Sequence, residues 1–299
     1  MDTQYKRSDK TMNPRRSVLY IPGANSRALD KAQTFACDAL IFDLEDAVAP
    51  TSKTVARQQV ESALQDGDFG YREIVLRVNG IDTPWGRDDL ALAAKINPHA
   101  VLFPKVESAG ELKDIISQLD RAGGSNLPVW VMIETPKSIL NVESIAHASP
   151  RISALVVGTS DLVKELRARH TSSRTNLSYA LQHCVLAARA ARIDVIDGVH
   201  LDFRNLADFE ISCAAGRDLG FDGKSLIHPS QIEVANKIFG ISDDEIEHAE
   251  KVLRAWHAAI SEGRGVAELD GQLIENLHSA EAERVLTFAQ ALKARSGEG

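Results

Sequence analysis

Two acidic residues, Glu134 and Asp161, follow two short apolar runs that are neighbours along the chain, residues 128–133 and 153–157. A pair of carboxylates that leaves coordination positions open suits Mg²⁺, a hard ion that keeps several waters and takes one or two protein carboxylates. The open positions could receive a substrate carboxylate and its adjacent oxygen. The alternative is that each residue caps the helix that follows it. The matched placement of the pair favours the metal site.

Arg77 ends another such run, and its permanent charge suits it to polarise a carbonyl or to hold a developing oxyanion. An earlier run ends in the sequence DLED at residues 43–46. A salt bridge from Arg77 to Glu45 or Asp46 is the alternative role, and it is compatible with catalysis. We expect Asp43 and Glu45 to point in different directions, so that one of them only fixes Arg77.

Further polar residues stand at equivalent places. Lys105 either contacts an anionic substrate or neutralises the acidic residues around it, and the sequence favours neither role. The Gly-Thr-Ser sequence at residues 158–160 precedes Asp161. If it begins a helix, its backbone N–H groups could bind a substrate carboxylate, because helix N-termini attract anions. The candidate substrate-binding residues are therefore Arg77, Asp46, Lys105, Gly158, Thr159 and Ser160.

Basic residues are dense near the amino end of the chain. Such a cluster on an acidic protein could receive phosphate groups. The alternative is an ordinary solvated face, and composition alone favours that alternative. The residues concerned are Arg15, Arg16, Arg27, Lys31, Lys53 and Arg57.

These residues form a site only if the fold brings them together. Near-continuous apolar runs alternate with helix-like stretches from Ser17 onward, which is typical of parallel strands buried on both faces. Eight such units indicate an α/β fold, a closed (β/α)₈ TIM barrel, whose active site lies at the carboxyl ends of its strands. No G-x-G-x-x-G follows the first run, which argues against a dinucleotide-binding fold. The predicted strands are residues 17–21, 39–43, 73–78, 100–103, 128–133, 153–157, 193–196 and 223–227.

The pattern changes after the eighth unit. Residues 243–260 have the spacing of one amphipathic helix, and residues 280–293 form a final helical stretch. Between them, residues 262–272 carry three glycines around one aspartate, so we expect a segment that can move as a lid. We therefore predict three parts: a flexible tail at residues 1–14, a barrel at 15–240, and a helical extension at 241–299 with the lid around 262–274.

Composition excludes several classes of protein. The chain has 299 residues, of which 44% are hydrophobic and 25% charged, and its net charge of −8 argues against a nucleic-acid-binding surface. No apolar run approaches the ~18 residues that a membrane helix needs, and the first residues do not have the pattern of a signal peptide. Three scattered cysteines predict reduced thiols, not disulfides or a zinc site. A cytoplasmic protein is expected.

Several segments together resemble a known family. They are RRSVLYIPGANSRALDKA, DALIFDLEDAVAP, VLRVNG, LFPKVES, VMIETPKSIL, ALVVGTSDL, DGVHLDF and GFDGKSLIHPSQI. Their order is similar to that of the citrate lyase β-subunit-like family, which belongs with malyl-CoA and citramalyl-CoA lyases in the HpcH/HpaI aldolase superfamily. The resemblance runs from about Arg16 to the C-terminus. The combination is specific, whereas any one segment alone is weak.

The resemblance implies the roles of several residues. It implies a (β/α)₈ barrel whose Mg²⁺, or alternatively Mn²⁺, is bound by Glu134 and Asp161. It also implies that Arg77 contacts the reacting oxygen of the substrate and that Glu45 lies near the substrate and the metal's waters. In relatives the lid aspartate, here Asp270, reaches a neighbouring subunit's site and exchanges a proton with the acyl-CoA methyl carbon. Homotrimers or hexamers are therefore implied, with CoA phosphates near Arg16, Arg27 and Lys31.

The activity that the resemblance implies is cleavage of a 3-hydroxyacyl-CoA into acetyl-CoA and a 2-oxo acid. The alternatives are a CoA-independent class II aldolase, a malyl-CoA thioesterase, a β subunit that works only within a multi-chain citrate lyase, and a barrel kept as a structural partner. The chain departs from the family pattern at Glu268, Gln272, His200 and the polar loop Lys164–Asn176. These departures spare the expected metal site and leave the acyl group open.

Overall fold

The computed structural model describes residues 12–296 and divides into two compact units. Arg15–Phe239 form one unit, and the residues from Gly240 onward belong to the other, so each unit is described by itself. The tail predicted at residues 1–14 falls largely on residues 1–11, which lie outside the described residues. None of the helices in the described part of the chain is long and apolar enough to span a membrane.

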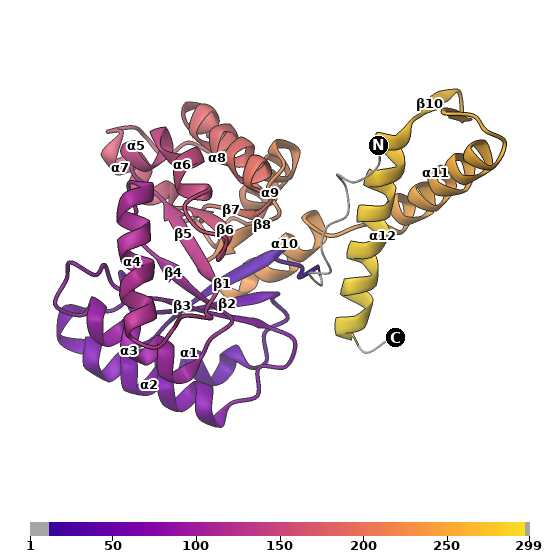
Figure 1. Ribbon diagram of the computed structural model, residues 1–299. Coiled ribbons are helices and arrows are strands. Elements are labelled where there is room, and N and C mark those ends of the chain that lie inside the picture. The colour runs from indigo at the N-terminus through magenta and orange to yellow at the C-terminus, as the bar shows by residue number, and fades with distance from the viewer. Residues whose placement is uncertain (1–11, 297–299) are drawn as a thin grey trace. The chain divides into compact units, whose positions relative to one another are not determined.

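The first unit is a closed barrel of eight parallel strands in sequential order, with β8 paired to β1, which confirms the predicted TIM barrel. Figure 1 shows the helices arranged around the strands. Each strand agrees with its predicted range to within one residue at either end. The strands are β1 (Ser17–Pro22), β2 (Ala39–Asp43), β3 (Glu73–Arg77), β4 (Ala100–Phe103), β5 (Val129–Ile133), β6 (Ile152–Val157), β7 (Asp194–Asp197) and β8 (Gly223–Leu226).

The helices of the barrel cover the outer faces of the strands. They are α1 (Ser26–Ala32), α2 (Lys53–Asp66), α3 (Gly86–Ile96), α4 (Ala109–Arg121), α5 (Pro136–Leu140), α6 (Val142–Ala146), α7 (Thr159–Glu165), α8 (Ser178–Ala191), α9 (Leu206–Leu219) and α10 (Ile232–Ile238). All three cysteines are buried and form no disulfide, in line with the predicted reduced thiols.

The alternation of side chains along the strands determines which charged residues face the inside of the barrel. In β2, Leu40 and Phe42 pack in the layer between the strands and the helices, whereas Ala39 and Ile41 pack inside the barrel. Successive side chains of a strand point to opposite faces, so the inward series of β2 ends in Asp43. The inward series of β3 runs in the same way from Val75 to Arg77. The barrel therefore has an apolar interior that becomes charged at the carboxyl ends of the strands.

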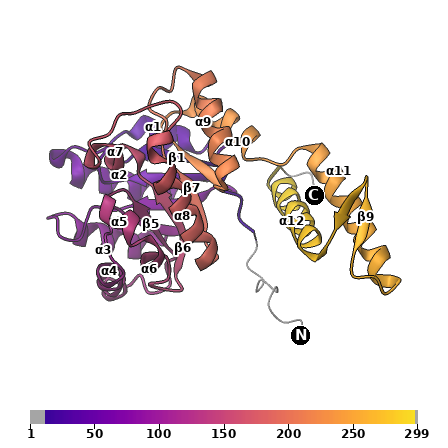
Figure 2. The ribbon, with the colours of Figure 1, turned by 90° about the horizontal axis from the view of Figure 1, so that it is seen from above.

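The second unit is a helical hairpin with its own small core. Its helices are α11 (Asp243–Ser261) and α12 (Asn276–Ser296), and between them β9 (Ala267–Leu269) and β10 (Gln272–Ile274) form an antiparallel pair. Figure 2 shows β9 beside α11. The predicted lid segment therefore contains a two-stranded hairpin, because Ala267 and Ile274 of β9 and β10 are buried in this core.

The turn of this hairpin is Asp270-Gly271, and both residues have positive φ, 52° and 77°. Such values are those of the type I′ turn, which matches the twist of two antiparallel strands and favours Asp-Gly. Asp270 is consequently exposed at the tip of an ordered hairpin. Any movement of this segment would carry the hairpin as a unit.

A buried ionic cluster ties the loop before α8 to the barrel. The carboxylate of Asp197 is fully buried, with Lys224 Nζ 2.7 Å from Oδ2 and Arg174 Nη1 2.7 Å from Oδ1. Burial alone would raise the pKa of Asp197, but the charges of Lys224 and Arg174 hold it below its usual value. Arg174 also donates to the carbonyl of Ser212, so the loop is held to β7, β8 and α9 together.

Replacing Asp197 with asparagine is expected to destabilise the fold by about 3–5 kcal/mol, because it leaves two buried cations without their counter-charge. Since the folded pKa of Asp197 is lowered, its stabilisation is present above the unfolded pKa and is lost as the pH falls through the folded value. Urea unfolding at neutral and acid pH measures both effects. The matched control is Asp88→Asn, whose exposed pairing with Arg57 is worth at most about 1 kcal/mol. Equal unfolding midpoints for the two variants would contradict the assignment.

Candidate active site

Glu134 follows β5 at the carboxyl end of the barrel and is 1% exposed. Its Oε1 accepts the backbone N–H of Lys105 at 2.7 Å. Burial raises the pKa of Glu134 to about 8, and the negative charges of Asp161 and Glu45 act in the same direction. The structure thus brings the two predicted metal carboxylates together in a place where their negative charge lacks full compensation.

Neither carboxylate is a helix cap, so that alternative is wrong. Thr135 caps α5, since its side chain accepts the N–H of Ser138. Gly158 occupies the cap position of α7, with no side-chain cap, and Asp161 lies in the first turn. Neither Glu134 nor Asp161 therefore caps the start of the helix that follows it.

The donor set fits a divalent cation. A buried carboxylate with a raised pKa becomes favourable as an anion when a cation is placed beside it. Among residues 12–296, no cluster of three or more His, Cys, Asp or Glu side chains could hold a metal ion. The arrangement therefore does not match a closed structural metal site. It matches an ion such as Mg²⁺, which binds through one or two carboxylates and keeps positions for water and substrate.

Gly158 gives Glu134 its space. A Cβ atom on Gly158 would lie 2.5 Å from both Cβ and Oε2 of Glu134, closer than real contacts allow. The N–H of Gly158 donates to the carbonyl of Ile133 at 3.0 Å. Gly158 is thus unable to offer that N–H to a substrate, which corrects its predicted binding role. The N–H groups of Thr159 and Ser160 lie in the first turn of α7, where no intrahelical acceptor exists.

Replacing Gly158 with alanine is expected to weaken Mg²⁺ binding by about 10- to 100-fold. Substitutions that disturb the orientation of a metal-binding side chain commonly have an effect of this size. The cause would be the shift that the new Cβ forces on Glu134. Calorimetric titration with Mg²⁺ measures it. Gly110→Ala is the matched control, since a Cβ there meets no atom within 4 Å. Unchanged affinity in Gly158→Ala would contradict the described contact.

Arg77 is held mainly by Asp43. Its Nε and Nη2 bind the two carboxylate oxygens of Asp43 at 2.7 and 2.6 Å, and the guanidinium lies 4.8 Å from the ring centroid of Tyr20. Burial alone would lower the pKa of Arg77, but the Asp43 carboxylate raises it well above its usual value. The remaining Nη1 lies 3.1 Å from Glu45 Oε2 and 3.9 Å from Asp46 Oδ2. The expected contacts with Glu45 and Asp46 exist, and Asp43 is the residue that fixes Arg77.

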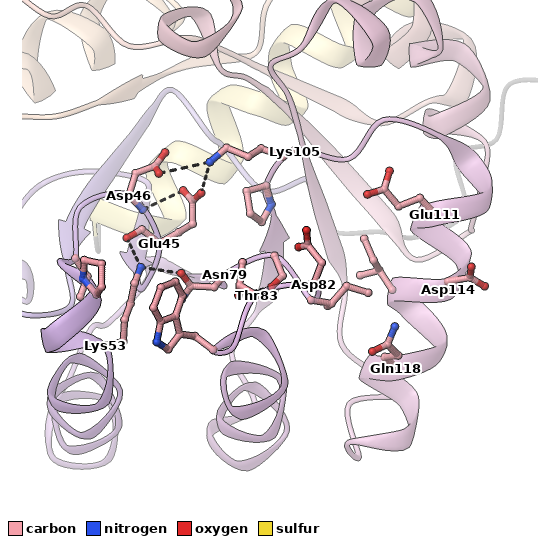
Figure 3. A pocket seen from close by; sticks show the side chains of 17 residues that line it. Glu45, Asp46, Lys53, Asn79, Asp82, Thr83, Lys105, Glu111, Asp114 and Gln118 are labelled. Atoms are coloured by element: carbon pink, nitrogen blue, oxygen red, sulfur yellow. Dashed lines mark hydrogen bonds and ion pairs between the residues drawn. The ribbon is translucent and has the colours of Figure 1, made fainter.

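Lys105 links the metal carboxylate to this network. Its backbone N–H reaches Glu134, while its Nζ lies 2.8 Å from Glu45 Oε1 and 3.6 Å from Asp46 Oδ1. Figure 3 shows Lys105 directed at both carboxylates. Its φ of 53° is uncommon for a residue with a side chain, and this conformation serves both contacts at once. The structure shows one of the two roles predicted for Lys105, since its ammonium group neutralises Glu45 and Asp46.

A cavity of about 950 Å³ opens beside these residues. Glu45, Asp46 and Lys105 form one end of it, and α4 forms another wall (Figure 3). The cavity is far larger than a small oxo acid needs. It is lined by Glu45, Asp46, Val48, Pro50, Lys53, residues 79–83, Trp85, Pro104, Lys105, Glu111, Asp114, Ile115 and Gln118.

The basic residues of the amino-terminal region do not form one patch. Arg16 precedes β1 and binds both oxygens of Asp38, which precedes β2. The pair therefore lies at the amino-terminal mouth of the barrel, away from Glu134, which argues against the predicted contact of Arg16 with CoA phosphates. Arg27 and Lys31 are exposed on α1, the helix that follows β1.

The other members of that group also have partners elsewhere. Arg15 binds Glu73 and Asp194. Arg57 binds Asp88 and Asp89 on α3. Lys53 is 5% exposed and binds backbone carbonyls close to the site. Arg15, Lys53 and Arg57 are therefore not part of an ordinary solvated face, which was the alternative expected from composition.

Sequence reasoning missed Tyr20, left open whether Asp43 or Glu45 fixes Arg77, and placed Lys53 only in a basic cluster. Extending the inward series of β1 and β2 by one step leads to Tyr20 and Asp43, as the alternation requires. Lys53 gives a different signal, because a lysine in the first turn of a helix faces the unfavourable end of the helix dipole. Asp270 belongs to the second unit and lies at the tip of its hairpin.

Residues 16–229 match the HpcH/HpaI aldolase/citrate lyase family. The chain belongs to this family. The resemblance stated from the sequence motifs is thereby confirmed. Glu134, Asp161 and Arg77 lie within the matched range and within the barrel unit.

Members of the HpcH/HpaI aldolase/citrate lyase family with different names are similar to this chain. It is 45% identical to a (3S)-malyl-CoA thioesterase of Cereibacter sphaeroides over 94% of this chain and 97% of that protein. It is 36% identical to the citrate lyase subunit beta of Escherichia coli, over 92% and 93% respectively. A crystal structure of protein CitE from Mycobacterium tuberculosis in complex with magnesium, acetoacetate and coenzyme A matches with a TM-score of 0.74 and 27% identity, covering 93% of this chain and 98% of that one.

Proposed function

We propose that this protein is a Mg²⁺-dependent lyase that cleaves the C–C bond of a 3-hydroxyacyl-CoA into acetyl-CoA and a 2-oxo acid. The observation that carries the proposal is the buried carboxylate of Glu134, whose pKa is raised by burial and by Asp161 at the carboxyl end of the barrel. A cation there would remove the cost of burying these charges. The similar structure of protein CitE that contains magnesium and coenzyme A supports the same assignment.

Each part of the site has a task in this reaction. Bound Mg²⁺, or Mn²⁺ in its place, would supply Lewis acidity that makes the substrate hydroxyl easier to deprotonate. Arg77, with two of its nitrogens held by Asp43, directs Nη1 toward the site and stabilises negative charge that develops on oxygen. Glu45, whose pKa is raised by burial, is a candidate acceptor for the hydroxyl proton. Asp270 then protonates the methylene carbon of the acetyl-CoA enolate.

Backbone and side-chain donors would make the substrate contacts. The N–H groups of Thr159 and Ser160, in the first turn of α7, would bind the oxo-acid carboxylate. Arg27 and Lys31 are exposed on α1 and available to the phosphates of CoA. We also propose that Asp270 acts in the site of a neighbouring subunit of a homotrimer or hexamer.

Hydrolysis of the thioester is a second candidate function, favoured by the 45% identity to (3S)-malyl-CoA thioesterases. In that reaction water adds to the thioester carbonyl carbon, the C–S bond breaks, and CoA leaves as a thiol with one of the water protons. The products from malyl-CoA would be malate and CoA. The two reactions share the acyl-CoA and differ in which bond breaks.

The test is a product analysis with malyl-CoA and (S)-citramalyl-CoA in the presence of Mg²⁺ or of excess EDTA. EDTA-sensitive formation of acetyl-CoA with glyoxylate or pyruvate is the expected result, and the oxo acid identifies the acyl group. Free CoA with malate or citramalate, and no acetyl-CoA, would replace the lyase with the hydrolase. Cleavage of the corresponding free hydroxy acids at the same rate would instead indicate an aldolase that does not need CoA.

A further inference from the structure

Lys53, the first residue of α2, uses its whole ammonium group inside the protein. Its Nζ donates to the carbonyl of Leu44 at 2.8 Å, to the carbonyl of Glu45 at 2.7 Å and to Oδ1 of Asn79 at 2.7 Å. An ammonium has three N–H bonds, so three acceptors occupy all of them. Lys53 is 5% exposed, and it therefore has no donor left for a substrate.

The surroundings of Lys53 fix its position. Asn79 Nδ2 donates to the carbonyl of Leu44 at 2.8 Å and to Asp89 Oδ2 at 2.6 Å. The ring centroid of Trp85 lies 5.1 Å from the Lys53 ammonium. Figure 3 shows Lys53 pointing at the backbone of Glu45 and at Asn79. Lys53 from α2 and Asn79 from the loop after β3 therefore hold the same carbonyl, that of Leu44.

The peptide that these groups hold carries the network around Arg77. Asp43 and Glu45 flank Leu44, and the N–H of Glu45 donates to Asp43 Oδ1 at 2.8 Å. Asp43 binds Arg77 with both oxygens, and Glu45 lies between Arg77 and Lys105. Rotation of the peptide after Leu44 would therefore move both carboxylates that contact Arg77.

We propose that Lys53 is a positioning residue that holds the carbonyls of Leu44 and Glu45 so that Asp43 and Glu45 aim Arg77 at the reacting oxygen. It acts through these residues and does not touch the substrate. The expected effect on turnover rests on the proposed lyase function. The effect on the backbone of residues 44–47 does not, because it follows from the hydrogen bonds alone.

The test is Lys53→Ala with added alkylammonium ions, which can enter through the adjoining cavity of about 950 Å³. Loss of positioning is expected to lower kcat by about 100-fold, the effect of a misplacement of roughly 1 Å, with KM changed little. Methylammonium or ethylammonium should restore part of kcat, since each supplies an ammonium with N–H donors. Tetramethylammonium has the same charge and no N–H donor, and it should restore nothing.

Hydrogen exchange gives a readout that does not need activity. The amides of Glu45 and Ala47 donate to Asp43 and should exchange faster in Lys53→Ala, with protection regained in methylammonium but not in tetramethylammonium. If the wild-type protein releases no acetyl-CoA from a 3-hydroxyacyl-CoA while this exchange pattern appears, the proposed function fails and the positioning role stands. Lys95→Ala, a substitution on the exposed end of α3, is the control and should leave kcat and exchange unchanged.

Two outcomes would overturn the inference. One is a Lys53→Ala protein with wild-type kcat and wild-type exchange at residues 45–47. The other is an activity loss that equals the loss of folded protein in a thermal melt and that tetramethylammonium restores as well as methylammonium does. If the alanine variant does not fold, Lys53→Met fills the space without donors. A normal kcat in that variant would equally rule out the positioning role.

Discussion

Replacing Glu134 with glutamine is expected to reduce the Mg²⁺-dependent rate by about 10³-fold or more, corresponding to several kcal/mol of lost metal-derived stabilisation. Glutamine has the shape of glutamate and can still accept the N–H of Lys105 through its side-chain oxygen. What it lacks is the negative charge that a metal needs. Steady-state rates across a Mg²⁺ titration measure the loss.

A stability measurement separates this effect from misfolding. Because burial raises the pKa of Glu134 to about 8, the metal-free protein holds a proton on this group at neutral pH, and that contribution to stability falls as the pH rises through 8. Glutamine imitates the protonated form. The variant without Mg²⁺ should thus melt at or above the wild-type temperature, and added Mg²⁺ should no longer raise it. A variant that Mg²⁺ still stabilises as it does the wild type would show that Glu134 is not a ligand.

Asp270→Asn is expected to lower kcat by about 10²- to 10⁴-fold, the usual contribution of a positioned acid or base, while Mg²⁺ binding stays unchanged. The φ of 52° at Asp270 is tolerated by asparagine, so the hairpin turn should persist. Glu268→Gln, two residues away on the exposed face of β9, is the matched control and should remain active. Full activity in Asp270→Asn would remove the hairpin from the reaction.

Mixing two inactive variants tests whether Asp270 acts in a neighbouring subunit. Asp270→Asn keeps an intact barrel site, and Glu134→Gln keeps an intact hairpin. If subunits exchange and the hairpin works in the neighbour's site, co-refolded mixtures should regain a fraction of wild-type activity. A mixture that stays as inactive as its components, with mixed oligomers shown by mass spectrometry, would place Asp270 in the site of its own chain or outside the reaction.

The barrel could be predicted because its strands carry their own signal. Runs such as residues 39–42 are buried on both faces, so they are apolar throughout, and the first charged residue after such a run, here Asp43, marks the strand's carboxyl end. That is why the sequence alone places Glu134 and Arg77 at one end of the barrel. The predicted role of Arg16 did not follow this rule. Arg16 precedes its strand and must therefore lie at the opposite mouth of the barrel.

The pairing within the site could not be predicted from spacing. Which carboxylate of the DLED sequence binds Arg77 depends on the register Asp43↔Arg77 between β2 and β3, and a sequence fixes register only through the packing of many side chains. The contacts of Lys53 depend on how α2 returns toward the loop that precedes it. The hairpin around Asp270 was overlooked because its glycines were interpreted as mobility, although Asp-Gly between two short runs is a strong hairpin signal.

Acetyl-CoA release from malyl-CoA by metal-free protein, followed as Mg²⁺ is added back, shows whether Glu134 and Asp161 hold a catalytic metal ion. We expect no release without the metal, a rise to saturation as Glu134 and Asp161 bind one ion, and half-saturation at the dissociation constant measured by calorimetry. Release of acetyl-CoA at an unchanged rate in the metal-free protein would contradict this expectation. So would protein that binds Mg²⁺ at these carboxylates and forms no acetyl-CoA from any 3-hydroxyacyl-CoA offered.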